Sequence, residues 1–185
     1  MKEANLPAVS QTADRTDEEL LSGFLDGEER CFAVLMNRYR DRVFRLVLRY
    51  LNGDRDAAED VAQQAFVKVF TEGAKFRGEG SLRSWLFTVA VNLAISETRR
   101  RARLSPEPAE VAVETHADAA MDRAAMSARL REAAARLPEK QRLVLTLRID
   151  AELPFSEIAR IARMSENSAK VNYHHAVTAL KRMLK

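Results

Sequence analysis

The chain has 185 residues, of which 46% are hydrophobic and 31% charged, and its 6 glycines and 5 prolines are too few to favour an all-β fold. No apolar run approaches the ~20 residues of a membrane-spanning helix, and the sequence contains neither a signal segment nor a second cysteine beside Cys31, so we expect a cytoplasmic protein without disulfides or direct membrane insertion. The net charge of +3 becomes +8 when the five acids of residues 104–122 are set aside, a surplus that favours polyanionic partners but is also common in proteins that bind none.

The first helix is expected to follow residues 1–15, which carry little apolar periodicity and are predicted to be disordered. Thr16 and Glu19 form a capping-box pattern, and Asp26 and Glu29 repeat that pattern before a second helix that Gly53 ends. The second helix is marked by apolar residues at helical spacing: Phe32, Leu35, Met36, Tyr39, Val43, Leu46, Val47 and Tyr50.

The segment from residue 54 to residue 76 has the most regular apolar stripe in the chain. The stripe consists of Ala58, Val61, Ala62, Ala65, Phe66, Val69 and Phe70. It leaves Asp60, Gln63 and Gln64 on the solvent side of the predicted helix. Taken alone, this polar side is an ordinary solvated face that needs no partner.

A loop with three glycines, over residues 73–80, precedes a predicted helix over residues 82–103. Its buried side is expected to hold Leu82, Trp85, Leu86, Val89 and Leu93, and its polar stripe Thr88, Asn92, Ser96, Arg99 and Arg103. Cations near a helix C-terminus are favoured by roughly 0.3–1 kcal/mol each. Four arginines at positions 99, 100, 101 and 103 exceed what capping requires and repel one another. We therefore favour polyanion binding over capping alone.

Residues 104–122 contain two prolines and only acidic charges, a composition that buries little and predicts a linker. No strand pattern interrupts the helical periodicities on either side. The predicted fold is therefore all-α, with two small helical domains, residues 16–103 and 123–185, joined by a flexible acidic linker.

The second domain is predicted to end in a helix-turn-helix, with a short helix over about 155–162 and a longer one that Ser165 caps. Ala159 is small enough for the close packing of the two helices. The longer helix is expected to turn Ala169, Tyr173, Ala176, Leu180 and Met183 inward and to expose Asn167, Ser168, Lys170, Val171, Asn172, His174 and His175. Such polar side chains suit base edges and phosphates, although an ordinary helical hairpin would show the same pattern.

Catalytic and metal-binding patterns are missing from the sequence. His116, His174 and His175 lack metal-ligand spacing with acidic partners, and no nucleophile–base pattern or phosphate-cradling glycine loop is present. We therefore expect neither enzymatic activity nor a cofactor.

Several segments, in order along residues 16–184, resemble the extracytoplasmic-function (group IV) sigma factors of bacterial RNA polymerase, which belong to the sigma-70 family. "DVAQQAF" is similar to the family's acidic signature through Asp60, Gln63 and Phe66. "SLRSWLFTVAVNLAISETRRRAR" resembles its Trp-Leu, Asn and Arg-rich segment, and "LPEKQR", "EIA" and Lys170 resemble its C-terminal helix-turn-helix. By this resemblance, residues 16–103 are region 2 and residues 123–185 are region 4.

The resemblance implies three binding surfaces. A polymerase-docking face for the β′ clamp would contain Glu59, Asp60, Gln63 and Gln64. A surface for the opened −10 element would contain Lys75, Arg77, Ser81, Arg83, Asn92, Ser96, Arg99, Arg100 and Arg103. The −35 element would be read as duplex by Ser165, Asn167, Ser168, Lys170, Val171, Asn172, His174 and His175. The implied partners are the polymerase core (β′ and β subunits), promoter DNA and an anti-sigma factor that is often tethered to the inner membrane.

Two residues depart from the family pattern. Arg163 stands where a glycine is common in the turn, and because a positive φ would strain arginine we expect another turn conformation. His175 replaces an arginine, so a phosphate contact there should weaken above about pH 6.5.

The predicted linker of 19 residues reaches at most about 65 Å, nearly two turns of B-DNA of roughly 34–36 Å each, so the two domains could hold separate promoter elements. The alternatives to a sigma factor are a stand-alone helix-turn-helix regulator and a module that binds protein alone.

Overall fold

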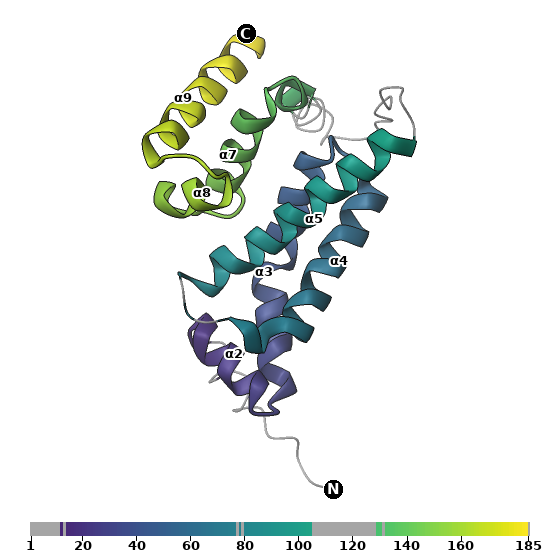
Figure 1. The fold of residues 1–185 in the computed structure, drawn as a ribbon, viewed down its shortest axis with the longest axis vertical. Helices are drawn as coiled ribbons and strands as arrows, with labels where there is room; N and C mark the ends of the chain where they lie inside the picture. Colours follow the sequence, from purple (N-terminus) through teal and green to yellow (C-terminus); the bar gives the residue numbers. More distant parts are fainter. Residues whose placement is uncertain are drawn as a thin grey trace, which may run out of the picture.

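A computed structural model of the chain describes residues 12, 14–76, 78, 80–104, 129, 130 and 132–184, which are helical with connecting turns and contain no strand (Figure 1). The all-α prediction is therefore confirmed. The helices are α2 (Asp17–Leu25), α3 (Glu29–Tyr50), α4 (Arg55–Glu72), the 3₁₀ turn η1 (Gly73–Lys75), α5 (Leu82–Leu104), α7 (Glu139–Ile149), α8 (Phe155–Ile161) and α9 (Glu166–Met183). None of the described helices is long and apolar enough to span a bilayer.

The capping box at the start of α2 is confirmed. The Glu19 amide donates to the Thr16 hydroxyl, and the Thr16 amide donates to the Glu19 carboxylate. The repeat of this device before α3 is wrong, because Asp26 closes α2 instead: its amide donates to the Ser22 carbonyl oxygen at 2.9 Å. A left-handed Gly27 then turns the chain, and α3 starts without a side-chain cap.

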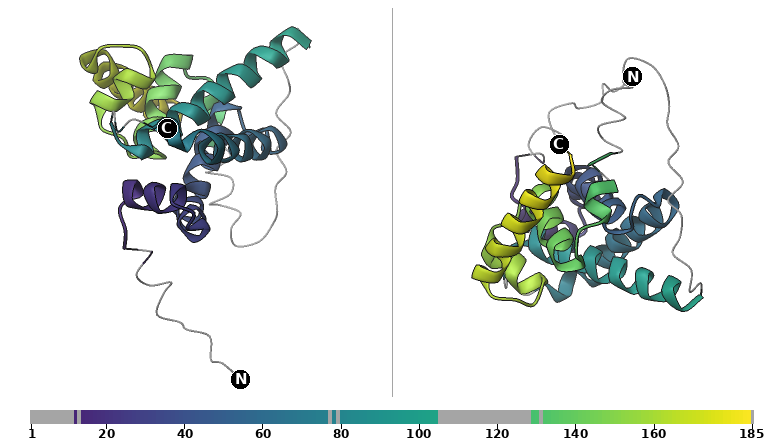
Figure 2. Two further views of the ribbon diagram at one scale, coloured as in Figure 1. Left: turned by 60° about the horizontal axis from the view of Figure 1, so that its bottom comes forward. Right: turned by 90° about the horizontal axis from the view of Figure 1, so that it is seen from above.

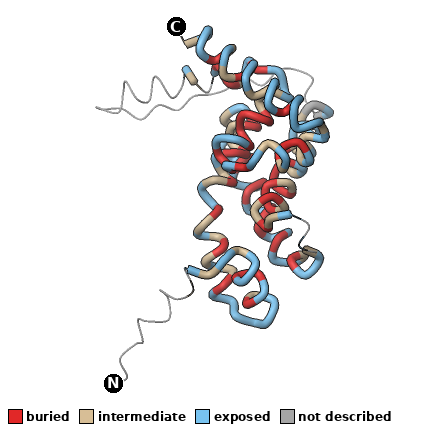
Figure 3. Tube along the Cα trace, turned by 90° about the vertical axis from the view of Figure 1, so that its left-hand side faces the viewer, coloured by how far each residue is buried: buried red, intermediate tan, exposed pale blue. Residues whose placement is uncertain are grey.

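Helices α2 to α5, here called the N-terminal group, pack around the predicted apolar positions of α3 and α4. The long helices α3, α4 and α5 lie side by side, and α2 covers one end of α3 (Figure 1). Buried residues face inward along these helices and exposed residues line the outside (Figure 3). Cys31 and Phe87 are fully buried in this core. Of the predicted stripe on α4, only Phe70 is wrong, since it is 52% exposed.

Helices α7 to α9, here called the C-terminal group, contain the predicted helix-turn-helix. Ser165 caps α9 as predicted, accepting a hydrogen bond from the Ser168 amide at 3.1 Å. Ala159 is buried against α9, as its small size suggested. Met183 is wrong as a core position, because it lies in the last turn of α9 and is 37% exposed.

The turn of the helix-turn-helix contains a residue, Arg163, in a strained backbone conformation. Arg163 has a φ of +52°, so the expectation of another turn conformation is wrong. The turn is held by hydrogen bonds that close a helix end: the Met164 amide donates to the Ala159 carbonyl at 2.9 Å, and the Arg163 amide donates to the Arg160 carbonyl at 3.3 Å. These bonds offset a left-handed cost of about 1–2 kcal/mol.

The two groups lie against each other and do not stand apart (Figures 1 and 2). One core continues from α3 into α7 and α8 through Leu143, Val144, Leu147, Leu153 and Ile158. A smaller cluster holds the end of α9 against α7, through Leu145, Ala176 and Leu180. Most of the predicted linker, residues 104–122, lies outside the described residues.

Candidate polymerase and nucleic-acid interfaces

The polar face of α4 is exposed as the sequence predicted. Glu59, Asp60, Gln63 and Gln64 all lie on the surface, and the buried residues of α4 lie on the opposite side. Glu59 forms a 2.9 Å ion pair with Arg55, one turn earlier. An exposed pair of this kind contributes little to stability, so the carboxylates and amides of this face are accessible to a partner.

Beside this polar face lies an exposed apolar patch that the sequence analysis missed. Phe70 packs against Phe24 in a tilted contact and against Phe32 edge-on, with ring centroids 5.0 and 5.2 Å away, yet half of it is open to solvent. Val67, one turn earlier, is 54% exposed. Val67 is an apolar residue outside the apolar stripe of α4, and this irregularity in the sequence could have predicted the exposed patch. Exposed aromatic and aliphatic side chains next to polar ones are typical of a protein-binding surface.

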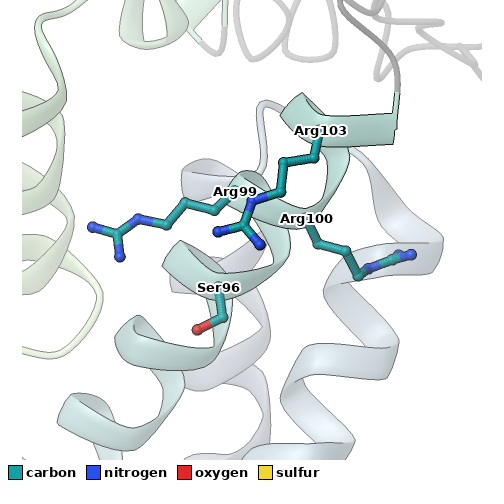
Figure 4. A pocket seen from close by; sticks show the side chains of 4 residues that line it. All are labelled: Ser96, Arg99, Arg100 and Arg103. Atoms are coloured by element: carbon teal, nitrogen blue, oxygen red, sulfur yellow. The ribbon is translucent and has the colours of Figure 1, made fainter.

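The arginine-rich end of α5 continues an exposed face, as predicted. Asn92, Ser96, Arg99 and Arg103 are exposed at steps of three and four, while Thr88 is half-buried. Ser96, Arg99, Arg100 and Arg103 line an open hollow of about 380 Å³ (Figure 4). Arg99 and Arg100 point to opposite sides of the helix in Figure 4, with Arg103 between them. A hollow lined by three guanidinium groups suits a phosphate-bearing chain.

The arginines of α5 differ in their partners. Arg100 makes two hydrogen bonds to Glu97, at 2.8 and 2.7 Å, and Arg101 bonds Glu97 and the Asp54 carboxylate that caps α4. The two guanidinium groups, Arg100 first, lower the pKa of Glu97 to about 2. Arg101 therefore joins α5 to the start of α4.

By contrast, Arg99 and Arg103 form no ion pair with an acid within the described ranges. Their charges are thus uncompensated by the N-terminal group, which leaves them available to a polyanion.

The residues predicted around the glycine loop are spread out. Lys75 lies in η1, 74% exposed, with Glu72 at 3.7 Å, and Arg83 is half-buried in the first turn of α5. Ser81 accepts a hydrogen bond from the Ser84 amide and donates to the carboxylate of Glu157, in α8 of the other group. Arg77 lies outside the described residues.

The predicted recognition helix α9 exposes nearly all of the residues that were predicted to contact DNA. Ser165, Asn167, Ser168, Lys170, Val171, His174 and His175 are exposed. Asn172 is half-buried, and its side-chain amide donates to the Ser168 carbonyl at 2.8 Å, so that donor is partly used within the helix. Lys170 forms a 2.7 Å ion pair with Glu166, and the two adjacent imidazole rings lie 6.5 Å apart. The described residues contain no cluster of three or more histidine, cysteine or acidic side chains that could hold a metal ion.

The sequence matches two family models, "Sigma-70 region 2" over residues 35–104 and "Sigma-70, region 4" over residues 127–180. One relative is the RNA polymerase sigma-H factor of Pseudomonas aeruginosa, which is 29% identical over 91% of this chain and 93% of that protein. Another is the ECF RNA polymerase sigma-E factor of Escherichia coli K12, which is 32% identical over 79% of this chain and 82% of that protein. The fold matches the sigma factor RpoE in complex with the anti-sigma factor NepR from Bartonella quintana, with a TM-score of 0.71 and 22% identity over 83% of this chain and 96% of that one. This chain belongs to the extracytoplasmic-function branch of the sigma-70 family.

Family membership confirms the resemblance found in the sequence and fixes the general activity. The chain is an alternative sigma factor, a transcription initiation factor that directs RNA polymerase to promoters. Regions 2 and 4 of such factors bind the polymerase core and promoter DNA. The family does not say which side chains of this chain do so.

Proposed function

We propose that this sigma factor docks on the polymerase core through α4, contacts the opened −10 strand through α5 and reads the −35 duplex through α9. It does so without a catalytic step or cofactor of its own. The observation that carries the proposal is the hollow at the end of α5, where Arg99 and Arg103 lack acidic partners within the described residues.

The docking face consists of Glu59, Asp60, Gln63 and Gln64, extended by the exposed Val67 and Phe70. Their polar groups would give specificity and orientation, and the two apolar side chains would bury surface on binding. Asp60 has no ion pair within the described residues, so its carboxylate is open to a basic group on the β′ clamp.

The −10 surface consists of Asn92, Ser96, Arg99, Arg100 and Arg103 on α5, with Lys75, Arg77, Ser81 and Arg83 near the preceding loop. The arginines would hold phosphates of the non-template strand, and the loop would receive an unstacked base, which repays part of the cost of opening the duplex. Arg100 contributes less than Arg99, because Glu97 already holds it.

The −35 surface is the exposed side of α9, listed above, and its first turn would enter the major groove. Lys170, Asn167 and Ser168 have the donors that base edges and phosphates accept.

An anti-sigma factor is the regulatory partner that the family suggests, since the solved relative carries one. The accessible α4 face is the surface where such a protein would compete with the polymerase. The chain would then act in the bacterial cytoplasm, either freely or held at the inner membrane through that partner.

The test is transcription of a promoter library by purified polymerase core with and without the protein. Transcripts that depend on the protein and share two spaced motifs are expected. Asp60→Arg should abolish core binding while helicity is unchanged, and Asp41→Arg, at an exposed site on α3, is the matched control. Tight duplex binding by the protein alone, with no transcripts, would instead identify a stand-alone regulator. Normal core binding by Asp60→Arg would remove the docking assignment.

A further inference from the structure

The exposed side of α9 has an apolar residue at its centre. Val171 is 44% exposed and lies one turn after Asn167, in the N-terminal half of the helix. Successive residues of a helix are rotated by about 100°, which places Ala169, Ala176 and Leu180 about 140–180° away from Val171. Those three are the buried residues of α9, so Val171 points away from the core.

The surroundings of Val171 on this side of the helix are polar. Within two turns and about 60° of it lie exposed polar residues: Asn167, Ser168, His174, His175 and Thr178. Its neighbours in the chain, Lys170 and Asn172, are rotated by about 100° to either side and so lie toward the edges of the face. A single exposed valine is ordinary on a protein surface. Here, however, it occupies the middle of the surface that the proposed function places in the major groove.

Several polar groups around this apolar centre already have partners within α9 and its cap. The Lys170 ammonium lies 2.7 Å from the Glu166 carboxylate, and the Asn172 side-chain amide donates to the Ser168 carbonyl at 2.8 Å. The Ser168 hydroxyl shares a 2.8 Å hydrogen bond with the Ser165 hydroxyl. These bonds orient the flanking side chains before DNA arrives, which lowers the entropy that binding costs.

Val171 itself has little conformational freedom to lose. A valine side chain is branched at Cβ and takes one strongly preferred rotamer in a helix. Its two methyl groups are therefore held in a nearly fixed position on the outer face of α9, and pressing them against a partner orders few additional torsions.

The major groove offers one methyl group to such a side chain. Of the four standard bases, only thymine presents a methyl there, at C5, and the other exposed groups include hydrogen-bond donors and acceptors. An aliphatic side chain pressed against a donor or acceptor would remove its water without replacing the hydrogen bond, which is unfavourable. The chemistry at the centre of α9 therefore matches a thymine edge better than any other.

We propose that Val171 is a specificity-determining residue that reads the C5-methyl group of one thymine in the −35 element. The proposal rests on the proposed reading of the −35 duplex by α9, and it names the base feature that the middle of this face selects. The −35 element should therefore contain an A·T pair whose thymine turns its methyl group toward Val171.

The test removes the methyl group from the DNA and the valine from the protein in a double-mutant cycle. Each thymine of the −35 element, on either strand, is replaced in turn by deoxyuridine, which lacks the C5-methyl and keeps the pairing edge. Competition binding then uses holoenzyme assembled from polymerase core and the full chain. One replacement should weaken binding by the parent holoenzyme about fourfold, as expected for one buried methyl group. Val171→Ala should weaken binding to the thymine promoter and abolish the response to that replacement.

Lys170→Ala is the matched control on the same helix, because Lys170 lies at the edge of the face. It should weaken binding to the thymine and uracil promoters by the same factor, and both variants should keep the helicity of the parent chain. A −35 element without an A·T pair, or a parent holoenzyme that binds every uracil promoter as tightly as the thymine promoter, would overturn the proposal. So would a full fourfold response in Val171→Ala. Holoenzyme that opens the promoter but leaves no footprint on the upstream duplex would instead refute the −35 assignment of α9.

Discussion

Two rows of arginines in this protein share a residue type and a helical spacing but differ in their partners. The row on α3, which contains Arg42, Arg45 and Arg49, meets acids of the C-terminal group. At the end of α5, Arg99 and Arg103 meet no acid within the described residues, and they border an open hollow. An arginine cluster therefore indicates polyanion binding only where the fold leaves its charges unpaired.

The largest effect is expected from reversing the unpaired charges. Arg99→Glu together with Arg103→Glu should lower promoter opening by roughly 100-fold or more, because the loss of two phosphate contacts is compounded by repulsion. Core binding should be unchanged, which a titration with labelled polymerase would check. Arg40→Glu, at an exposed site on α3, is the matched control. Loss of core binding and opening together would mean that these arginines have a structural role.

A smaller effect is expected from Arg49→Ala, which removes the closest cation to Asp150. Breaking a buried ion pair costs about 3–5 kcal/mol when the remaining charge stays buried. Arg45, which lies 3.9 Å from Asp150, remains to offset its charge, so the unfolding free energy in urea should fall by less than that. A full loss of about 3 kcal/mol or more would show that Arg45 does not compensate for the missing cation.

Arg101→Ala tests whether the arginines of α5 divide into structural ones and DNA-binding ones. Arg101 bonds Asp54 and Glu97, so its loss should lower the unfolding free energy by roughly 1 kcal/mol, as expected for a partly exposed network. Promoter opening, measured with a fluorescent base analogue, should stay within about twofold of the parent. A loss as large as that of the Arg99 variant would contradict the division between structural and binding arginines.

The smallest effect concerns pH. The pKa of Glu97 is lowered from 4.5 to about 2, first by its hydrogen bonds with Arg100 and Arg101. A lowered folded-state pKa stabilises the protein above the unfolded value, and this contribution is lost as the pH falls from about 5 toward 2. Glu97→Gln should therefore reduce stability at neutral pH and flatten the acid decline, as urea unfolding at several pH values would show. Parallel pH profiles for both chains would contradict this assignment.

Features set by neighbouring residues could be predicted from the sequence, and features set by distant ones could not. The caps at Thr16 and Ser165 follow from residues three positions apart, so the local pattern sufficed. The polar faces of α4, α5 and α9 follow from helical periodicity in the same way. The residue roles on those faces came only from the resemblance, and they stay predictions.

The failures have specific physical causes. Phe70 fits the apolar period of α4, but half of it stays exposed beside Phe24 and Phe32, and no pattern within α4 could reveal that exposure. Arg163 takes a left-handed conformation because the hydrogen bonds of the turn outweigh its strain. The contact of Arg49 with Asp150 joins residues far apart in the chain, and periodicity carries no information about such pairs.

The shared core of α3 and α7 has a thermodynamic consequence. Two groups that bury the same apolar side chains lose their structure together, so the protein should melt in one cooperative transition. A partner that separates them would leave each with its own smaller core and its own melting temperature. Calorimetry of the sigma factor alone and with a bound partner would then measure the number of cooperative unfolding transitions. That number would show whether the two groups approach the promoter as one rigid unit or as two independent ones.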